Sequence, residues 1–275
     1  MKQLPFKQVD VFTSRPFYGN PVAVVIGAGE LDSATMQRIA AWTNLSETTF
    51  LLPPTQPAAS YKLRIFTPRQ ELPFAGHPTV GSAHAALESG FAKAANGKLK
   101  QECGAGVLHL TVEESRIYVR APEPKVKPVD TPLFGKAQAL RVDVGPIWVV
   151  VDMGEAQAVD ELAPDMPAIE ELSHELHATG VTVFGRTGSA AMPIHVRSFA
   201  PAHGVPEDPV CGSGNVSVGA FLRQTGLLKE FGPNYTARQG MQVGRDGRVQ
   251  LRVSADAIQI GGEAVTCVDG KLRVD

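Results

Sequence analysis

The stretch RIFTP at residues 64–68 is echoed in the second half of the chain by RSFAP at residues 197–201. Each copy is a short run that ends at a proline, and each is followed by a glycine turn that leads into an apolar helical pattern. The two turns are GHPTV at residues 76–80 and GSGNV at residues 212–216. An internal repeat of this kind predicts two halves of similar design, each with a strand whose following loop begins a helix. A ligand is expected between the halves, because inter-domain clefts are preferred pockets.

Hydrophobic periodicity around the repeat predicts a mixture of strands and helices. Residues 6–12 alternate between polar and apolar types and residues 22–26 are rich in valine, which predicts a hairpin across the turn residues between them. Apolar residues recur at helical spacing in residues 33–42 and in residues 76–90, each of which predicts a helix. Further strands are predicted at residues 49–52, 61–66, 107–110, 117–120, 147–151 and 195–199.

Residues 121–132 contain four prolines among alternating charges, which is typical of a domain linker. The first domain is therefore predicted to cover residues 1–121, and the second to begin at residue 129.

The composition excludes several classes of function. The 275 residues carry 26 Lys and Arg against 28 Asp and Glu, a net charge of −2, so no broad basic surface is available to neutralise nucleic-acid phosphates. The longest apolar stretches, residues 22–26 and 147–151, are far shorter than the ~18 residues needed to cross a bilayer. Residues 1–10 lack the apolar core of a signal peptide. We therefore expect a cytoplasmic protein, bound neither to a membrane nor to nucleic acid, that acts on a small molecule.

Metal and disulfide chemistry are not expected. Cys103, Cys211 and Cys267 are odd in number and far apart, which predicts reduced thiols. His174 and His177 lie on a predicted helix, but they are one residue closer together than in a zincin and have no third ligand. The chain also lacks the GxSxG elbow of many hydrolases.

The two glycine turns are candidates for anion binding. A helix N-terminus offers unpaired N–H groups and the positive end of the helix dipole, so that two such ends facing one cleft could hold a carboxylate. In the alternative interpretation Ser213 caps its own helix, and Gly76 and Gly212 only form turns. Residues 212–217 approach the dinucleotide-binding fingerprint without completing it, and no GK[ST] sequence occurs, so nucleotide binding is not expected.

Three side chains near these turns could move protons. Glu47 lies between a predicted helix and a predicted strand; it is either a solvated loop acid or, if it is sheltered from water, a carboxyl with a raised pKa that can exchange protons with carbon. Asp208 precedes the second turn, where it could complement the helix dipole or orient a substrate amine. His77 is either a solvated residue at the start of a helix or a proton donor.

Five motifs are spread over nearly the whole chain: FYGNP at residues 17–21, NLSET at 44–48, FTP at 66–68, ELPFAGHPT at 71–79 and EDPVCGSG at 207–214. Together they resemble the PhzF-like family of phenazine-biosynthesis isomerases, which are relatives of diaminopimelate epimerase. They also occur in the family's order.

The resemblance implies an α+β fold of two pseudo-symmetric domains, each a highly curved mixed β-sheet or barrel around a central α-helix. It also implies that the last strand, at residues 263–275, returns to the first domain, so that the second domain covers residues 129–262. The active site is then expected in the cleft between the two domains.

The resemblance further implies an isomerase without a cofactor, commonly a homodimer, that moves a proton within an unsaturated cyclic amino acid. The role of the catalytic acid and base falls on Glu47, assisted by His77 and Asp208. The substrate-binding positions fall on Gly76, Gly212 and Ser213, and Cys211 is placed with them.

One departure separates this chain from the two-thiol racemases that are similar to this family. Those enzymes have a cysteine before the glycine of each turn, whereas this chain has Ala75 before Gly76 and Cys211 before Gly212. Racemisation by two thiols is therefore excluded. Two alternatives stay open: an epimerase in which Cys211 is one of two bases, and a protein that binds small amino or carboxylic acids without catalysis.

Overall fold

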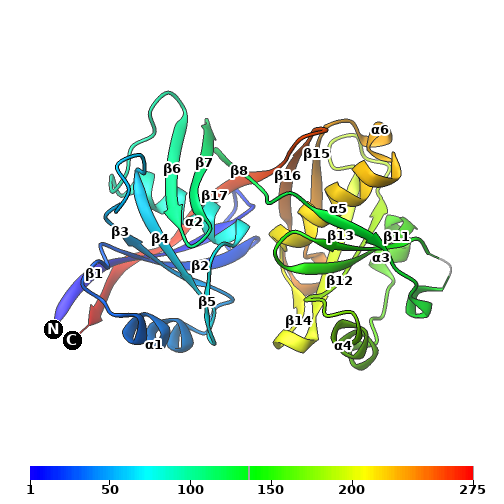
Figure 1. The fold of residues 1–275 in the computed structure, drawn as a ribbon, viewed down its shortest axis with the longest axis horizontal. Helices are drawn as coiled ribbons and strands as arrows, with labels where there is room; N and C mark the ends of the chain where they lie inside the picture. Colours follow the sequence, from blue (N-terminus) through cyan, green and yellow to red (C-terminus); the bar gives the residue numbers. More distant parts are fainter. Residues whose placement is uncertain (136, 275) are drawn as a thin grey trace. The chain divides into compact units, whose positions relative to one another are not determined.

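The computed structural model describes residues 1–135 and 137–274, and the chain divides into two compact units (Figure 1). Unit 1 consists of Met1–Arg120 and Gly261–Asp275, and unit 2 consists of Ala121–Ile260. The proline-rich stretch predicted to be a linker belongs to unit 2. Its residues Lys125–Pro128 form strand β9, which pairs with the next strand rather than leaving the sheet, so the linker interpretation is wrong there.

Unit 1 is a closed barrel. Strands β1 and β2 are antiparallel, β2 and β3 are parallel, β3 and β4 are antiparallel, and β4 and β6 are parallel. Strands β6, β7 and β8 continue the sheet in antiparallel order, and β17 pairs with both β8 and β1 and so closes the ring. The elements of unit 1 are β1 (Lys2–Val11), β2 (Asn20–Ile26), α1 (Ser33–Thr43), β3 (Thr48–Leu52), β4 (Tyr61–Phe66), β5 (Glu71–Leu72), α2 (Gly76–Glu88), β6 (Lys98–Cys103), β7 (Gly106–Glu113), β8 (Arg116–Arg120) and β17 (Ile258–Val274). The first three residues of β17 belong to unit 2.

Helix α2 lies inside this barrel (Figure 1). It contacts β1, β2, β3, β4 and β8, which are strands from around the ring, and most of its residues are buried. The helix fits because its buried residues are small. A Cβ atom added to Gly81 would lie 2.5 Å from a methyl group of Val22, so that even alanine would be too large at this position.

Unit 2 repeats the plan of unit 1 around helix α5. Its strands run in the order β9, β10, β11, β12, β13, β15 and β16, with parallel pairs at β11–β12 and β13–β15 and antiparallel pairs elsewhere. The elements are β9, η1 (Pro132–Phe134), β10 (Ala139–Asp143), β11 (Ile147–Glu155), α3 (Ala156–Asp160), α4 (Met166–Glu175), β12 (Gly180–Arg186), β13 (Ile194–Ala200), η2 (Pro201–His203), β14 (Val205–Asp208), α5 (Gly212–Thr225), α6 (Leu228–Phe231), β15 (Asn234–Gln239), η3 (Met241–Val243) and β16 (Gly247–Val253).

The sequence repeat corresponds to equivalent places in the two units. RIFTP forms the end of β4 and RSFAP the end of β13, and each strand pairs antiparallel with the one before it. In both units the repeated arginine lies over the repeated phenylalanine ring, with 5.0 Å to the ring centroid. The predicted fold class, two similar domains of curved mixed sheet around a central helix, is therefore confirmed.

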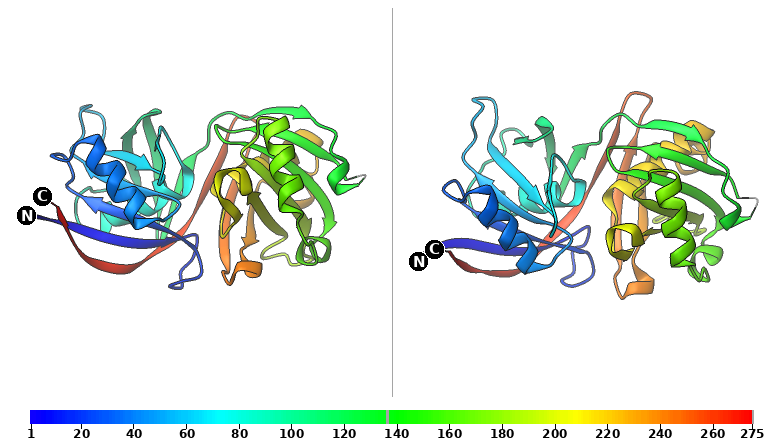
Figure 2. Two further views of the ribbon diagram at one scale, coloured as in Figure 1. Left: turned by 90° about the horizontal axis from the view of Figure 1, so that it is seen from below. Right: turned by 60° about the horizontal axis from the view of Figure 1, so that its bottom comes forward.

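Each sheet is covered on its outer face by a helix. In unit 1 the buried residues Met36 and Ala40 of α1 pack against Phe50 and Phe66, and Figure 2 shows this helix outside the strands. In unit 2, Ile169 of α4 packs in a cluster with the strand residues of the sheet. The chain ends lie side by side in Figure 2, because β1 pairs with β17 from Lys2 opposite Val274. Within the described residues, no helix is long and apolar enough to cross a membrane.

Candidate active site

The loop that carries Glu47 is fixed at both ends. Helix α1 ends at Thr43, and Asn44 takes up the left-handed conformation with φ of 54°, which turns the chain toward β3. The carbonyl of Glu47 accepts a hydrogen bond from the backbone N–H of Ala23, and the hydroxyl groups of Thr43 and Thr48 are 2.6 Å apart. Glu47 is therefore held immediately before the buried strand β3.

The Glu47 carboxyl is sheltered and lies beside His77. Its Oε2 atom is 3.4 Å from Nε2 of His77, and the two side chains are only 16% and 7% exposed. Burial raises the pKa of Glu47 to about 7, and a hydrogen bond with Ser46 opposes this only in part. Of the two interpretations of Glu47, the solvated loop acid is excluded by this burial, and the sheltered carboxyl fits the structure.

The first glycine turn places His77 at the start of the central helix of unit 1. Helix α2 begins at Gly76, and Ala75 before it has an extended backbone and provides no side-chain cap. His77 is the second residue of the helix, so the Glu47 carboxyl lies near the positive end of the α2 dipole. Gly76, His77 and Glu47 are thus brought together within unit 1.

The second glycine turn has a different cap from the one weighed in the sequence. Cys211 is the N-cap residue of α5, and its Sγ atom accepts from the backbone N–H of Gly214 at 3.2 Å. The alternative in which Ser213 caps its own helix is therefore wrong. Burial raises the pKa of the Cys211 thiol well above its usual range, which keeps it protonated. Within the described residues, the backbone N–H groups of Gly212 and Ser213 donate no hydrogen bond.

Two residues that the sequence did not single out hold this turn in place. The buried side chain of Gln239, on β15, accepts from the backbone N–H of Cys211 at 3.1 Å and donates to the carbonyl of Asp208 at 3.0 Å. The indole N–H of Trp148, on β11, donates to Oγ of Ser213 at 2.9 Å. Both come from strands far from the turn in sequence, so no local spacing could have indicated them.

The remaining histidines are not arranged for metal binding. Helix α4 ends at Glu175 and His177 lies beyond it with φ of 46°, so that His174 and His177 do not share a helix as predicted. The side chain of His174 is 70% exposed. His84 is partly buried on α2, 3.2 Å from the hydroxyl of Thr266. No group of three or more His, Cys, Asp or Glu side chains that could hold a metal ion occurs in residues 1–135 and 137–274.

Comparison with known proteins identifies the family to which this chain belongs. Residues 9–270 match the family described as "Phenazine biosynthesis-like protein". The chain belongs to this family. The resemblance stated from the motifs is therefore confirmed, and with it the assignment of the protein as an isomerase of the PhzF family.

The similarity to individual family members extends over the whole chain. "Antisense-enhancing sequence 1" of Schizosaccharomyces pombe is 39% identical, over 98% of this chain and 99% of that protein. The trans-2,3-dihydro-3-hydroxyanthranilate isomerase of Pseudomonas chlororaphis is 32% identical, over 96% of this chain and 97% of that enzyme. The crystal structure of a PhzF-family phenazine biosynthesis protein from Bacillus anthracis superposes with a TM-score of 0.87 at 26% identity, covering both chains completely.

Proposed function

We propose that this PhzF-family isomerase moves a proton within a small unsaturated amino or carboxylic acid, and that Glu47 carries the proton. The observation that supports this proposal is a sheltered carboxyl beside His77 whose pKa is raised to about 7. Near neutral pH such a group is present in both the ionised and the protonated form. It can therefore accept a proton from one carbon and return it to another, which general acid–base catalysis requires.

The proposed reaction balances within the substrate and one carboxyl group. The Glu47 carboxylate removes a proton from a carbon next to the double bond, and the electron pair of that C–H bond shifts through the conjugated system. The protonated Glu47 then delivers the proton to the far carbon, so that the double bond moves and the enzyme returns to its starting form. The start of α2, with its positive dipole end near Glu47, would stabilise negative charge that develops on the substrate.

We assign the recognition of the substrate to the second glycine turn. The free backbone N–H groups of Gly212 and Ser213 suit a carboxylate, because a helix N-terminus favours anions. Asp208 suits a protonated amine. His77 would orient the Glu47 carboxyl, and Gly76 would allow the substrate to approach the start of α2 closely.

The first substrate to test is trans-2,3-dihydro-3-hydroxyanthranilate, which the relative from Pseudomonas chlororaphis isomerises according to its name. In heavy water, NMR should show deuterium entering the substrate carbons with the wild-type protein. Glu47→Gln keeps the size of the side chain and removes the base, so deuterium incorporation should fall by about 10²- to 10⁴-fold. Glu30→Gln, which changes an exposed carboxyl of unit 1, is the matched control and should leave the rate unchanged. Wild-type turnover by Glu47→Gln would refute the assignment.

The two alternatives from the sequence predict different outcomes. An epimerase that uses Cys211 needs a thiolate, but burial raises the pKa of this thiol well above its usual range, which disfavours that role. The epimerase alternative predicts that Cys211→Ala abolishes deuterium exchange into the substrate. A binding protein without catalysis predicts that amino or carboxylic acids raise the melting temperature while no deuterium enters carbon.

The predicted homodimer and the cytoplasmic location stay predictions. Sedimentation equilibrium of the purified protein tests the first, and cell fractionation tests the second.

A further inference from the structure

Trp148 is hydrogen-bonded to Ser213, one of the residues assigned to substrate binding. It is buried on β11, where Val142 of β10 and Gly180 of β12 are its neighbours in the sheet. From this strand its indole reaches the second residue of α5 and donates a hydrogen bond to Oγ of Ser213 at 2.9 Å.

This hydrogen bond has only one possible direction. An indole N–H is a donor and never an acceptor, whereas a serine hydroxyl both donates and accepts. The oxygen of Ser213 must therefore accept from Trp148, and the hydroxyl hydrogen must point to another partner. Within the described residues the one such partner is Sγ of Cys211 at 3.7 Å, which already accepts from Gly214. Sulfur is a weak acceptor, so the Ser213 hydrogen stays available for a stronger one.

We propose that Trp148 is a positioning residue that fixes Ser213 as a hydrogen-bond donor to the carboxylate of the substrate. This proposal rests on the substrate-binding role assigned to Ser213 above. The indole N–H of Trp148 occupies one lone pair of the Ser213 oxygen, so the Ser213 hydroxyl hydrogen points elsewhere. This hydroxyl and the backbone N–H groups of Gly212 and Ser213 then form a set of donors at the start of α5. A carboxylate accepts hydrogen bonds through both oxygens and matches such a set.

The choice of side chain supports a role beyond packing. A phenylalanine would fill most of the same buried space without a polar atom. A buried indole instead has an N–H group that must find a partner, because an unsatisfied donor in the protein interior is costly. For the indole N–H of Trp148 this partner is the hydroxyl of Ser213, in the second glycine turn.

The hydrogen bond can be tested without any substrate, by NMR of the indole N–H groups in ¹⁵N-labelled protein. The chain has two tryptophans, and Trp42 is 77% exposed, so Trp42→Phe identifies its solvent-like signal and leaves that of Trp148. Ser213→Ala should move the Trp148 N–H signal upfield, because a hydrogen-bond acceptor is lost. An unchanged Trp148 signal in Ser213→Ala would overturn the proposal, whatever the activity of the protein.

The positioning role is tested by a double-mutant cycle on the isomerisation of trans-2,3-dihydro-3-hydroxyanthranilate. Ser213→Ala should raise KM about 10-fold or more, since a hydrogen bond to a charged group is lost. Trp148→Phe should raise KM about 3- to 10-fold with little change in kcat, and should add nothing in the Ser213→Ala background. Tyr235→Phe, which removes a hydroxyl from another buried aromatic residue of unit 2, is the matched control and should leave KM unchanged.

The outcomes separate this proposal from the proposed function. If Ser213→Ala raises KM and Trp148→Phe raises it independently, so that the two effects multiply, the positioning role is wrong and the role of Ser213 stands. If Ser213→Ala leaves KM unchanged, both the positioning role and the assignment of Ser213 fail. The proton-transfer role of Glu47 is decided separately by deuterium incorporation in Glu47→Gln.

Discussion

At the scale of single residues, the pKa of Glu47 predicts how the reaction depends on pH. The carboxyl must be ionised to accept a proton from carbon, and burial raises its pKa to about 7. We therefore expect kcat/KM to rise with pH, with an apparent pKa of about 7, and to level off above it. Initial rates measured from pH 5 to pH 9 test this expectation.

His77 is the natural control, because histidine also titrates near neutrality. His77→Asn should lower the rate but keep the rise near pH 7, since the titrating group is Glu47. If the rise disappears in His77→Asn, the pH dependence belongs to the imidazole and the assignment of the base must be reversed.

The same burial predicts that Glu47 reduces stability at alkaline pH. A carboxyl whose pKa is raised in the folded state binds its proton more tightly there than in the unfolded chain, so its contribution to stability falls as pH rises from 4.5 to about 7. Glu47→Gln should therefore raise the free energy of unfolding at pH 8.5 by on the order of 2–3 kcal/mol, and much less at pH 5. Urea unfolding at both pH values measures this, with Glu30→Gln as the exposed control. An equal effect at both pH values would contradict it.

The sequence could indicate the site residues but not their surroundings. The position of Glu47 between a helix and a strand was predictable, whereas its burial and its place beside His77, which lies on another element, were not. The sequence offered Ser213 as the cap of α5 in one of two interpretations and gave no sign of Cys211, because serine is a common N-cap and cysteine is not. Gln239 and Trp148 act on the second turn from distant strands, so only the folded chain reveals them.

At the scale of elements, segments with a regular pattern of apolar residues could be predicted from the sequence. Segments with a mixture of polar and apolar residues could not. The helix at α2 and the strand at β4 follow clear apolar patterns and were predicted close to their observed bounds. Strand β6, with the sequence KLKQEC, was not predicted because it alternates poorly. Its buried polar residues bond to groups distant in sequence: Gln101 accepts from the hydroxyl of Tyr61, and Glu102 accepts from the backbone N–H of Thr55.

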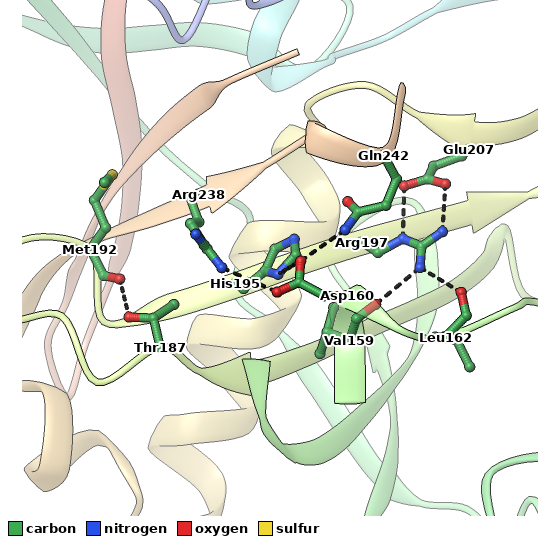
Figure 3. A network of polar contacts seen from close by, with 10 residues as sticks. All are labelled: Val159, Asp160, Leu162, Thr187, Met192, His195, Arg197, Glu207, Arg238 and Gln242. Atoms are coloured by element: carbon green, nitrogen blue, oxygen red, sulfur yellow. Dashed lines mark hydrogen bonds and ion pairs between the residues drawn. The ribbon is translucent and has the colours of Figure 1, made fainter. Parts of the chain in front are cut away.

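Strand β13 carries a buried histidine that predicts an acid-sensitive step in stability (Figure 3). Nδ1 of His195 is 3.1 Å from a carboxylate oxygen of Asp160 on α3, and Gln242 and Arg238 also bond to that carboxylate. Burial lowers the pKa of His195 to about 4; Asp160 opposes this shift, while Arg238 and Arg197 add to it.

A lowered histidine pKa destabilises the fold in acid. Between pH 6.5 and about 4, His195 is protonated in the unfolded chain but stays neutral in the folded protein. The free energy of unfolding therefore falls as pH decreases through this window. His195→Gln should weaken this loss by on the order of 1–2 kcal/mol, allowing for the half-exposed Asp160 beside it. Urea unfolding at pH 7 and pH 4.5 measures the difference. His174→Gln, which changes a histidine that is 70% exposed, should leave the loss as it is in the wild type; the same change in both variants would exclude His195.

At the scale of the whole molecule, the sequence repeat predicted two units of one design, and the structure shows where the repeat is unequal. Each repeated arginine forms a two-pronged ion pair with a glutamate on the following short strand, Arg64 with Glu71 and Arg197 with Glu207. Figure 3 shows the second pair, in which Arg197 also donates to the carbonyl groups of Val159 and Leu162. The side chains of the second pair are 5% and 9% exposed, against 20% and 42% for the first.

This difference in burial predicts unequal effects for the same substitution in the two units. Glu207→Gln leaves a buried guanidinium without its counter-charge and should cost about 3–5 kcal/mol of stability, whereas Glu71→Gln breaks a pair that water already screens and should cost about 0–1 kcal/mol. Far-UV circular dichroism during urea unfolding follows the strands and helices of both units. The free energy of unfolding measured in this way should fall strongly in Glu207→Gln and hardly in Glu71→Gln. Equal losses in the two variants would mean that burial does not set the strength of the repeated ion pair.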